Sequence, residues 1–503
     1  GAVWISDTYH QQFLRELLND QSVRVINTLP GRWEVKGREW GVQATKDWGT
    51  DRYPATRVAA AVMEQRQSAV KDTVRLGDGR ERQELNPVET TAALEKAEQL
   101  QERFGAWIWE DPERATKLAA AYNRAFNSIR LRGYDDVGQY LTFPGLSESI
   151  SLRPHQRTAV ARMIAEPTVG LFHGVGAGKT LEMISGAMEM KRMGLVKKPC
   201  IVVPNHMLEQ FSREWLQAYP QAMILAAGTD ELRGDGRRMF VARAAANEWD
   251  GIVLTQTAFE MLPVSREARL GYIDREVTKM RVALDEAREA DARSIKSLEK
   301  SVLSFEQQLM KRLDKARDPG ITFEATGVDY LMVDEAHMYK NLATVSNIQG
   351  AAIAGSERAT DLHMKLELLR ERNGARIATL ATATPLANSV TEANVMLRYL
   401  RPDLLDEAGV TSFDGWAATF GQQVTEMEMG PAGGFRLKER FARFQNVPEM
   451  LKMWHVFADV KTPDDLDLPV PAVAARPSDG KREVETVVLQ PTPSLESFVE
   501  TLG

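Results

Sequence analysis

The chain carries a glycine-rich segment whose residue types suit a cradle for phosphate groups. Residues 173–180 read HGVGAGKT, after a short apolar run and before a helical pattern. Glycines let a backbone curl closely around phosphates because no Cβ stands in the way, and three are present: Gly174, Gly176 and Gly178. The following helix would direct its amino-terminal N–H groups toward the same phosphates. Lys179 would reach the outer phosphates and Thr180 would bind Mg²⁺, so we expect a nucleoside triphosphate site.

This phosphate loop departs from the strict pattern at one position. Where the pattern has a glycine, five residues before Gly178, this chain has His173. The alternative interpretation is a glycine-rich turn without function. The Gly-Lys-Thr ending, the apolar run before it and the helical pattern at residues 181–191 favour the phosphate loop.

An acidic pair far downstream supplies the groups that the phosphate loop lacks. Asp334 and Glu335 directly follow an apolar run at residues 330–333, so both would emerge where a strand ends. The Asp334 carboxylate would hold Mg²⁺, and Glu335 would orient or deprotonate an attacking water. Phosphoryl transfer depends mainly on positioning and charge neutralisation. The two motifs together therefore predict hydrolysis of a nucleoside triphosphate.

Short apolar runs separated by helical patterns would position these motifs. Five such runs occur, at residues 169–172, 200–203, 251–254, 330–333 and 377–380. Continuous apolar strands that alternate with helices are typical of a parallel sheet covered by helices on both faces. Function then lies at the carboxyl ends of the strands, where both motifs fall. We predict an α/β fold for this part of the chain.

The length of 503 residues corresponds to about three domains. Residues 1–150 carry no phosphate chemistry and read as an accessory α+β region. Residues 151–402 would form the ATPase lobe. Residues 403–480 read as a helical extension and linker, and residues 481–503 would begin a second lobe that is otherwise absent.

Local patterns within the accessory region are helical at residues 7–18, 89–109 and 112–131, with a β-hairpin within 23–42. Its aromatic residues would form either a core or a stacking surface for nucleic acid: Trp107, Trp109 and Tyr122. Basic residues alternate with aromatic ones at residues 435–444, which fits a grip on nucleic acid and an amphipathic helix equally.

A highly charged segment at residues 266–317 interrupts the lobe. Apolar residues recur in it at spacings of three and four, in stripes at residues 277–284 and 295–309. This pattern predicts an antiparallel helical hairpin that projects from the sheet. The hairpin would contact DNA or a partner, or it would be a solvated structural insertion.

Composition excludes several classes of protein. The net charge of −7 means that any contact with nucleic acid depends on a local patch. The single cysteine, Cys200, excludes a disulfide framework and a zinc cluster. No apolar run approaches the roughly 20 residues that a membrane span needs. We expect a cytoplasmic protein that makes no membrane contact.

The sequence Asp-Glu-Ala-His at 334–337, with the phosphate loop upstream, resembles the first motor lobe of superfamily-two DEAD/DEAH helicase-like ATPases. Residues 152–156 (LRPHQ) resemble the glutamine motif of Swi/Snf-type DNA translocases, in which Gln156 would bind adenine. The resemblance covers about residues 150–470. It implies a RecA-like sheet, ATP and Mg²⁺ as cofactors, and duplex DNA as the favoured partner.

Further segments resemble the DNA-contact and coupling motifs of these translocases. The first contact motif would include Pro204 and Asn205, and the second would include Thr255 and Gln256. Residues 382–388 resemble the coupling motif, although alanines replace its usual glycine and glutamine. The resemblance implies that three residues couple nucleotide state to DNA grip: His337, Thr382 and Thr384.

Such motors need a second RecA-like lobe with arginine fingers, and no matching pattern follows Val484. Segments near the amino terminus resemble large bacterial and phage proteins in which an adenine methylase precedes the helicase. We therefore expect a motor lobe from a longer polypeptide, with a possible upstream methylase, that serves DNA modification, defence or counter-defence. The alternative is an ATP-dependent interaction switch that uses the helical hairpin as a docking arm.

Overall fold

The computed structural model describes residues 4–502 with internal gaps. The residues outside the description are 1–3, 30–31, 65–67, 76–80, 287–302, 304–305, 308–309, 311–320, 345, 347–352, 354, 388–389, 430–434, 467–472, 477–478, 483–489 and 503.

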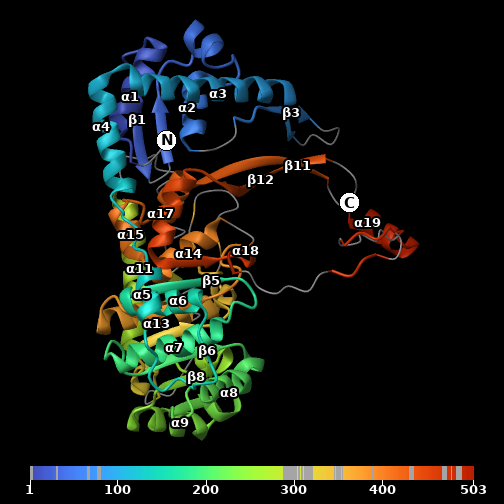
Figure 1. Cartoon of the computed structure of the whole chain (residues 1–503). Coiled ribbons are helices and arrows are strands. Elements are labelled where there is room, and N and C mark those ends of the chain that lie inside the picture. Colours follow the sequence, from blue (N-terminus) through green and yellow to red (C-terminus); the bar gives the residue numbers. More distant parts are fainter. Residues whose placement is uncertain are drawn as a thin grey trace.

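A seven-stranded sheet forms the centre of the lobe (Figure 1). Its strand order is β13-β5-β10-β9-β6-β8-β7, and every neighbouring pair is parallel. The strands are β5 (Thr168–His173), β6 (Pro199–Val203), β7 (Ile224–Ala227), β8 (Gly251–Thr255), β9 (Tyr330–Val333), β10 (Ala378–Ala381) and β13 (Ala458–Lys461). Strands β5, β6 and β8 are buried along their whole length, as a sheet covered on both faces requires. The predicted α/β fold class and all five predicted strands are confirmed.

Two edge strands, β7 and β13, lack a sequence signal. They lie at opposite ends of the strand order, and each is only partly buried. A half-buried edge strand does not show the unbroken apolar run that identifies a central strand. Because β13 pairs with β5, the sheet continues past residue 402 into the segment predicted as extension and linker.

Helices cover both faces of this sheet. Alternate residues of one strand enter two different hydrophobic clusters, as Ile201 and Val202 do. The cluster with Ile201 also contains α6 (Pro154–Ala165), α7 (Lys179–Arg192) and α8 (Leu208–Ala218). The cluster with Val202 contains α9 (Asp235–Ala246), α10 (Gln256–Glu260), α13 (Glu357–Asn373), α14 (Thr391–Leu400), α15 (Pro402–Glu407), α16 (Phe413–Phe420) and α17 (Val447–Phe457). The buried Cys200 lies in this second cluster as a free thiol.

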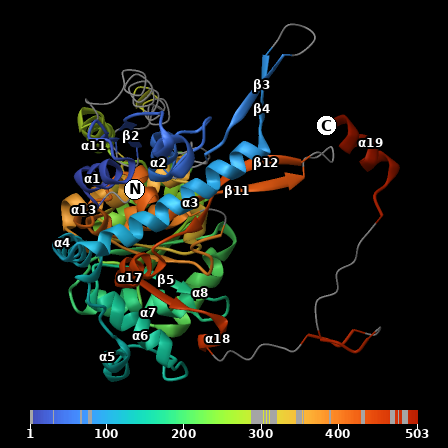
Figure 2. The same cartoon turned by 90° about the horizontal axis from the view of Figure 1, so that it is seen from above.

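The accessory region has a hydrophobic core of its own. Its elements are α1 (Asp7–Leu18), β1 (Arg24–Leu29), β2 (Arg32–Lys36), α2 (Ala55–Met63), β3 (Lys71–Arg75), β4 (Glu81–Leu85), α3 (Pro87–Glu110) and α4 (Pro112–Tyr122). The predicted hairpin is confirmed because β1 and β2 pair antiparallel, and a second hairpin, β3–β4, projects from the region (Figure 2). Trp107 is a core residue, whereas Trp109 is 71% exposed.

The accessory region packs against the lobe. After α4 the chain continues as a π-helical turn, η2 (Asn123–Asn127), that reaches α17 (Figure 1). Phe126 of this turn is buried in the lobe's own cluster, with its ring centroid 5.9 Å from that of Phe420. The Tyr122 hydroxyl donates to the Glu449 carboxylate of α17. Residues 1–128 and the lobe therefore share part of one core.

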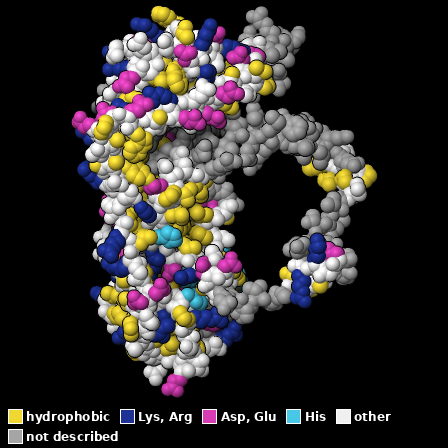
Figure 3. All heavy atoms as spheres, turned by 45° about the horizontal axis from the view of Figure 1, so that its top comes forward, with side chains coloured by type: hydrophobic (Ala, Val, Ile, Leu, Met, Phe, Trp, Pro, Cys, Tyr) yellow, Lys and Arg dark blue, Asp and Glu magenta, His cyan; other side chains and the backbone are white. Residues whose placement is uncertain are grey.

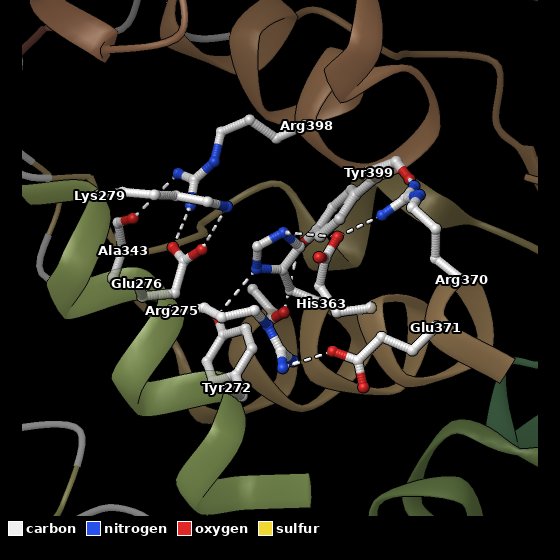
Figure 4. Close-up of polar contacts among 12 residues, drawn as sticks. Tyr272, Arg275, Glu276, Lys279, Ala343, His363, Arg370, Glu371, Arg398 and Tyr399 are labelled. Carbon is white, nitrogen blue, oxygen red and sulfur yellow. Dashed lines mark hydrogen bonds and ion pairs between the residues drawn. The ribbon is translucent and has the colours of Figure 1, made fainter. Parts of the chain in front are cut away.

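A buried polar network fixes helix α11 (Arg266–Glu286) to the lobe (Figure 4). The Glu276 carboxylate lies 3.1 Å from the Arg398 guanidinium of α14, and the Tyr272 hydroxyl lies 2.8 Å from His363 Nδ1 of α13. Burial alone would raise the pKa of Glu276, but the positive charge of Arg398 brings it down to about 2. Burial lowers the pKa of His363 to about 3, so this imidazole is neutral.

The first helix of the predicted insertion is thus confirmed, and it is anchored in the lobe. Most of its predicted antiparallel partner lies outside the described residues. Beyond α16, strand β11 (Gly421–Met429) pairs antiparallel with β12 (Phe435–Phe444), so the helical interpretation of residues 435–444 is wrong. Helices α18 (Pro463–Leu466) and α19 (Pro493–Leu502) follow, and the strand expected within 484–489 lies outside the described residues. Among the described helices, none has the length and apolar character to cross a bilayer.

Candidate active site

The phosphate loop connects the end of β5 to the first turn of α7. Gly176 and Gly178 have φ values of 82° and 87°, in the left-handed region that favours glycine. Gly178 is the N-cap of α7, and no side chain caps the helix. No side chain therefore competes with an anion at the start of the helix, and the helix dipole favours negative charge at the same place.

Lys179 spans this loop. Its Nζ donates to the carbonyl oxygens of His173 and Gly174 at 2.9 and 3.2 Å. Both partners are neutral carbonyl groups, so neither of them neutralises the ammonium. Among the groups that shift the pKa of Asp334, Lys179 acts to lower it, which places the lysine charge near the acidic pair.

Gln156 lies against the phosphate loop from α6. Its Oε1 accepts from the N–H of Arg153 at 2.8 Å, and its Nε2 donates to the carbonyl of Gly178 at 3.2 Å. A Cβ at position 178 would lie 2.4 Å from that Nε2, so a side chain there would displace the Gln156 amide, while the φ of 87° favours glycine by itself. The amide of Gln156 is engaged by backbone groups in this conformation.

The acidic pair follows β9, as predicted. Asp334 is buried, and burial followed by the charge of Glu335 raises its pKa to about 6. Glu335 has φ 50° and ψ 48°, a left-handed conformation that costs a residue with a side chain about 1–2 kcal/mol. Backbone strain of this kind concentrates at functional sites.

A chain of polar contacts links Glu335 to the predicted coupling residues. His337 Nδ1 lies 3.0 Å from Glu335 Oε2 and 3.2 Å from Thr382 Oγ1. The N–H of Thr384 donates to the same Thr382 Oγ1 at 3.1 Å. The N–H of Thr382 in turn donates to the carbonyl of Leu171 in β5 at 3.1 Å.

Sheet order explains why these motifs meet. β9, β10 and β5 are neighbours and run parallel, so their carboxyl ends share one edge. The acidic pair follows β9, Thr382 follows β10, and the phosphate loop follows β5. Three motifs that are up to about 200 residues apart in sequence thus converge, as the positions of the apolar runs predict.

The predicted DNA-contact residues have different environments. Asn205 is exposed at the end of β6, and its Nδ2 donates to Thr257 Oγ1 at 2.9 Å. Its neighbour Pro204 is partly buried. Thr255 is buried and caps α10, with its Oγ1 accepting from a backbone N–H at 3.2 Å. Gln256 is also buried, and its Oε1 accepts from an Arg358 guanidinium at 3.4 Å.

Strand β13, which no apolar run predicts, supports the phosphate loop. The N–H of Gly174 donates to the carbonyl of Lys461 at 2.8 Å, which extends the β5–β13 pairing into the loop. The signal available in the sequence is a short alternation, Ala-Asp-Val-Lys at 458–461, after an amphipathic helix.

The donor set fits Mg²⁺ only together with a nucleotide. Among the described residues, no group of three or more His, Cys, Asp or Glu side chains is placed to hold a metal ion. Mg²⁺ in nucleotide sites takes one or two protein oxygens and completes its shell with phosphate oxygens and water. A hydroxyl from Thr180 and a carboxylate from Asp334 would supply oxygens of that kind.

The chain is similar to a curated phage protein and to solved structures that include two of one ATPase core. The chain is 24% identical over 413 residues to "Defense against restriction protein B" of Escherichia phage P1, a match that covers 73% of this chain and 18% of the relative. It is similar to two structures of the Sulfolobus solfataricus SWI2/SNF2 ATPase core, one of them in complex with dsDNA. These show 14% and 15% identity, TM-scores of 0.35 and 0.33, 66% coverage of this chain, and 49% and 48% coverage of those chains.

Two family models match the chain itself. A domain of unknown function, DUF8437, matches residues 1–128, which include the accessory helices α1 to α4 and the turn η2 that contacts α17. The model described as a probable helicase domain matches residues 163–462, from α6 through β13. This second match spans more than half of the chain and includes the phosphate loop, the acidic pair and the coupling residues. The chain therefore belongs to the probable helicase domain family, as its motifs predict.

Proposed function

We propose that the chain is the ATP-binding and ATP-hydrolysing motor lobe of a translocase or helicase that acts on duplex DNA. The observation that carries this proposal is the convergence of the phosphate loop, the acidic pair and the His337–Thr382 contact at one sheet edge. Membership of a helicase family supports a motor ATPase. The glycine φ values and the uncapped start of α7 support an anionic ligand at the loop.

The residues would divide the chemistry as follows. Lys179 would neutralise charge on the outer phosphates, while Thr180 and Asp334 would hold Mg²⁺, which supplies further charge neutralisation when bound. Glu335 would orient the attacking water and accept its proton. Gln156 would exchange its contact with the Gly178 carbonyl for the edge of adenine.

His337, Thr382 and Thr384 would report the state of the nucleotide to the DNA-binding surface, because they connect Glu335 to the end of β10. Asn205 would contact the DNA backbone directly. Thr255, Gln256 and Pro204 would shape the same surface from within, since they are buried or partly buried.

Contact with DNA would be local. On the face that Figure 3 shows, the described acidic and basic side chains are interspersed over the surface. This agrees with the net charge of −7 and with the expectation of a local patch. Phosphate contacts of this kind position a protein without specifying a sequence.

The lobe would work within a longer, cytoplasmic polypeptide. The chain spans 18% of its phage P1 relative, whose name refers to defence against restriction. A second RecA-like lobe would supply the arginine fingers that complete phosphoryl transfer. An adenine methylase would precede the lobe, and the whole would serve DNA modification, defence or counter-defence.

The test is ATP hydrolysis with and without duplex DNA, measured for this chain and for its longer natural polypeptide. We expect duplex DNA to stimulate turnover, and Glu335→Gln to lower the stimulated kcat about 100-fold or more. Glu209→Gln, an exposed position on α8, is the matched control and should leave kcat unchanged. A forked duplex in the same assay separates strand opening from translocation without unwinding.

ATP binding without any response to DNA, in the longer polypeptide as well, would contradict the motor assignment. That result would favour the interaction switch. Its signature is an ATP-dependent change in affinity for a protein partner with no change in affinity for DNA.

A further inference from the structure

A buried histidine lies at the base of the phosphate loop. His173 ends β5 at the position where the strict pattern has glycine, and it is fully buried. Its Nδ1 lies 3.0 Å from Glu182 Oε1 of α7, and its Nε2 lies 3.5 Å from Asp459 Oδ1 of β13. Both carboxylates are buried as well. The imidazole therefore bridges the helix after the loop and the edge strand beside it.

The bridge is ionic. Burial alone would lower the pKa of His173, but Asp459 and Glu182 together raise it to about 9. Burial also opposes ionisation of Asp459, yet its contact with His173 holds the pKa of that carboxyl below its usual value. A buried cation is stable only where charged partners replace water. The remaining charged or titratable groups that face the cluster come from α6 and β13: His155, Arg162 and Lys461.

The same residue reaches the nucleotide site through its backbone. The carbonyl of His173 accepts a hydrogen bond from Lys179 Nζ at 2.9 Å. The next residue, Gly174, donates to β13 through its N–H, and a Cβ there would lie 3.3 Å from Pro463 Cδ. A shift of the imidazole would therefore move the first residues of the loop. It would also move the His173 carbonyl that accepts from Lys179 Nζ.

We propose that His173 is a positioning residue of the nucleotide site, which pins the phosphate loop between α7 and β13 before a nucleotide binds. This inference rests on the proposed ATP-binding function and deepens it. Pre-organisation lowers the entropy that binding must overcome, so its loss appears as weaker nucleotide affinity. A histidine that only filled space would affect stability and leave affinity unchanged.

The test compares the dissociation constant of Mg–ATPγS among variants of the full chain by titration calorimetry. We expect His173→Gln and Asp459→Asn each to weaken binding about tenfold, since each removes one charge of the His173–Asp459 ion pair. The double variant should be weaker by less than the product of the two effects, because the two residues share one contact. His363→Gln is the matched control: His363 is also buried, but its contacts are with Tyr272 of α11, Glu367 of its own helix and Tyr399 of α14.

The control should melt at a lower temperature than wild type and keep wild-type affinity. Wild-type affinity in His173→Gln and Asp459→Asn would overturn the inference, as would an equal loss in His363→Gln. If His173→Gln does not fold, Asp459→Asn and its comparison with His363→Gln decide the question.

A further arm, Lys179→Ala, separates this inference from the proposed function. If wild type binds Mg–ATPγS and Lys179→Ala does not, the nucleotide site stands, and the histidine variants alone decide the role of His173. If wild type does not bind, the proposed function fails and the inference falls with it.

Discussion

Glu335 combines a proposed chemical role with a backbone conformation that its own side chain disfavours. Its φ of 50° lies in the left-handed region, while its carboxylate lies 3.0 Å from His337 Nδ1. Asp334 beside it is buried with a pKa raised to about 6, so the pair brings two acidic groups together at a cost in stability. Sites that need such an arrangement usually trade stability for activity.

This conflict predicts that Glu335→Gly raises stability and abolishes hydrolysis. Glycine adopts φ 50° without strain, but it also has more conformational freedom in the unfolded chain. The relief of strain is the larger effect, so we expect the free energy of unfolding to rise by about 1 kcal/mol. Glu335→Gln keeps the strained backbone and also lacks the carboxylate, so it separates strain from charge. Thermal unfolding should show a higher midpoint for the glycine variant than for the glutamine variant, with hydrolysis lost in both. Equal midpoints would show that the strain contributes no measurable free energy.

Residue types and spacing predicted most of the residues that the structure brings together at the candidate site. The sequence alone identified the loop glycines, Lys179 and the acidic pair, because phosphate chemistry restricts which residues serve there. It did not identify the charge on His173, because that charge depends on Asp459, which lies 286 positions away and on an unpredicted strand. It also did not reveal that Gln256 is buried, since burial of a polar residue depends on its neighbours in space.

Strands and helices differ in how well their sequence patterns predict them. Central strands such as β6 carry unbroken apolar runs, and all five were predicted. β7 and β13 are half-buried edge strands, so their short mixed sequences resemble loops. Residues 435–444 satisfied a helical pattern but pair with β11 as β12, because pairing with the adjacent strand of a hairpin overrides a weak helical preference.

At the scale of elements, the pair between Glu276 of α11 and Arg398 of α14 is the strongest test of how the insertion is anchored. Both side chains lie in the network of Figure 4, and Glu276 has a pKa lowered to about 2. Arg398→Met would leave a buried carboxylate without its main partner, at a cost of about 3–5 kcal/mol. Adding Glu276→Met should recover much of that loss, because two apolar side chains need no pairing.

The measurement is the thermal midpoint of both single variants and the double variant. The double variant should melt above Arg398→Met.

The pKa of Glu276 also determines how the free energy of unfolding depends on pH. Because the folded pKa of about 2 lies below the usual glutamate pKa of 4.5, the stabilisation by Glu276 is present above pH 4.5 and is lost as the pH falls toward 2. Arg398→Met should flatten that dependence. An unchanged dependence of stability on pH would contradict the view that Arg398 holds the pKa of Glu276 low.

For the molecule as a whole, the decisive contact is the one that joins the accessory region to the lobe. Phe126 follows α4 in sequence, yet its side chain lies in the core cluster of the lobe against Phe420. The Tyr122–Glu449 hydrogen bond adds a polar contact across the same junction. A shared core couples the unfolding of two regions, so the chain should lose residues 1–128 and the lobe in one cooperative transition.

We therefore expect Phe126→Ala to uncouple the two regions. Removing a buried phenylalanine ring costs about 3–5 kcal/mol, and here that cost falls on the junction and leaves both separate cores intact. Calorimetry should resolve two transitions where wild type shows one, and limited proteolysis should release a fragment that ends near residue 128. Trp109→Ala, at a residue 71% exposed on α3, removes a comparable aromatic ring without touching the junction and should preserve the single transition. A single transition in both variants would mean that the junction depends on contacts other than Phe126.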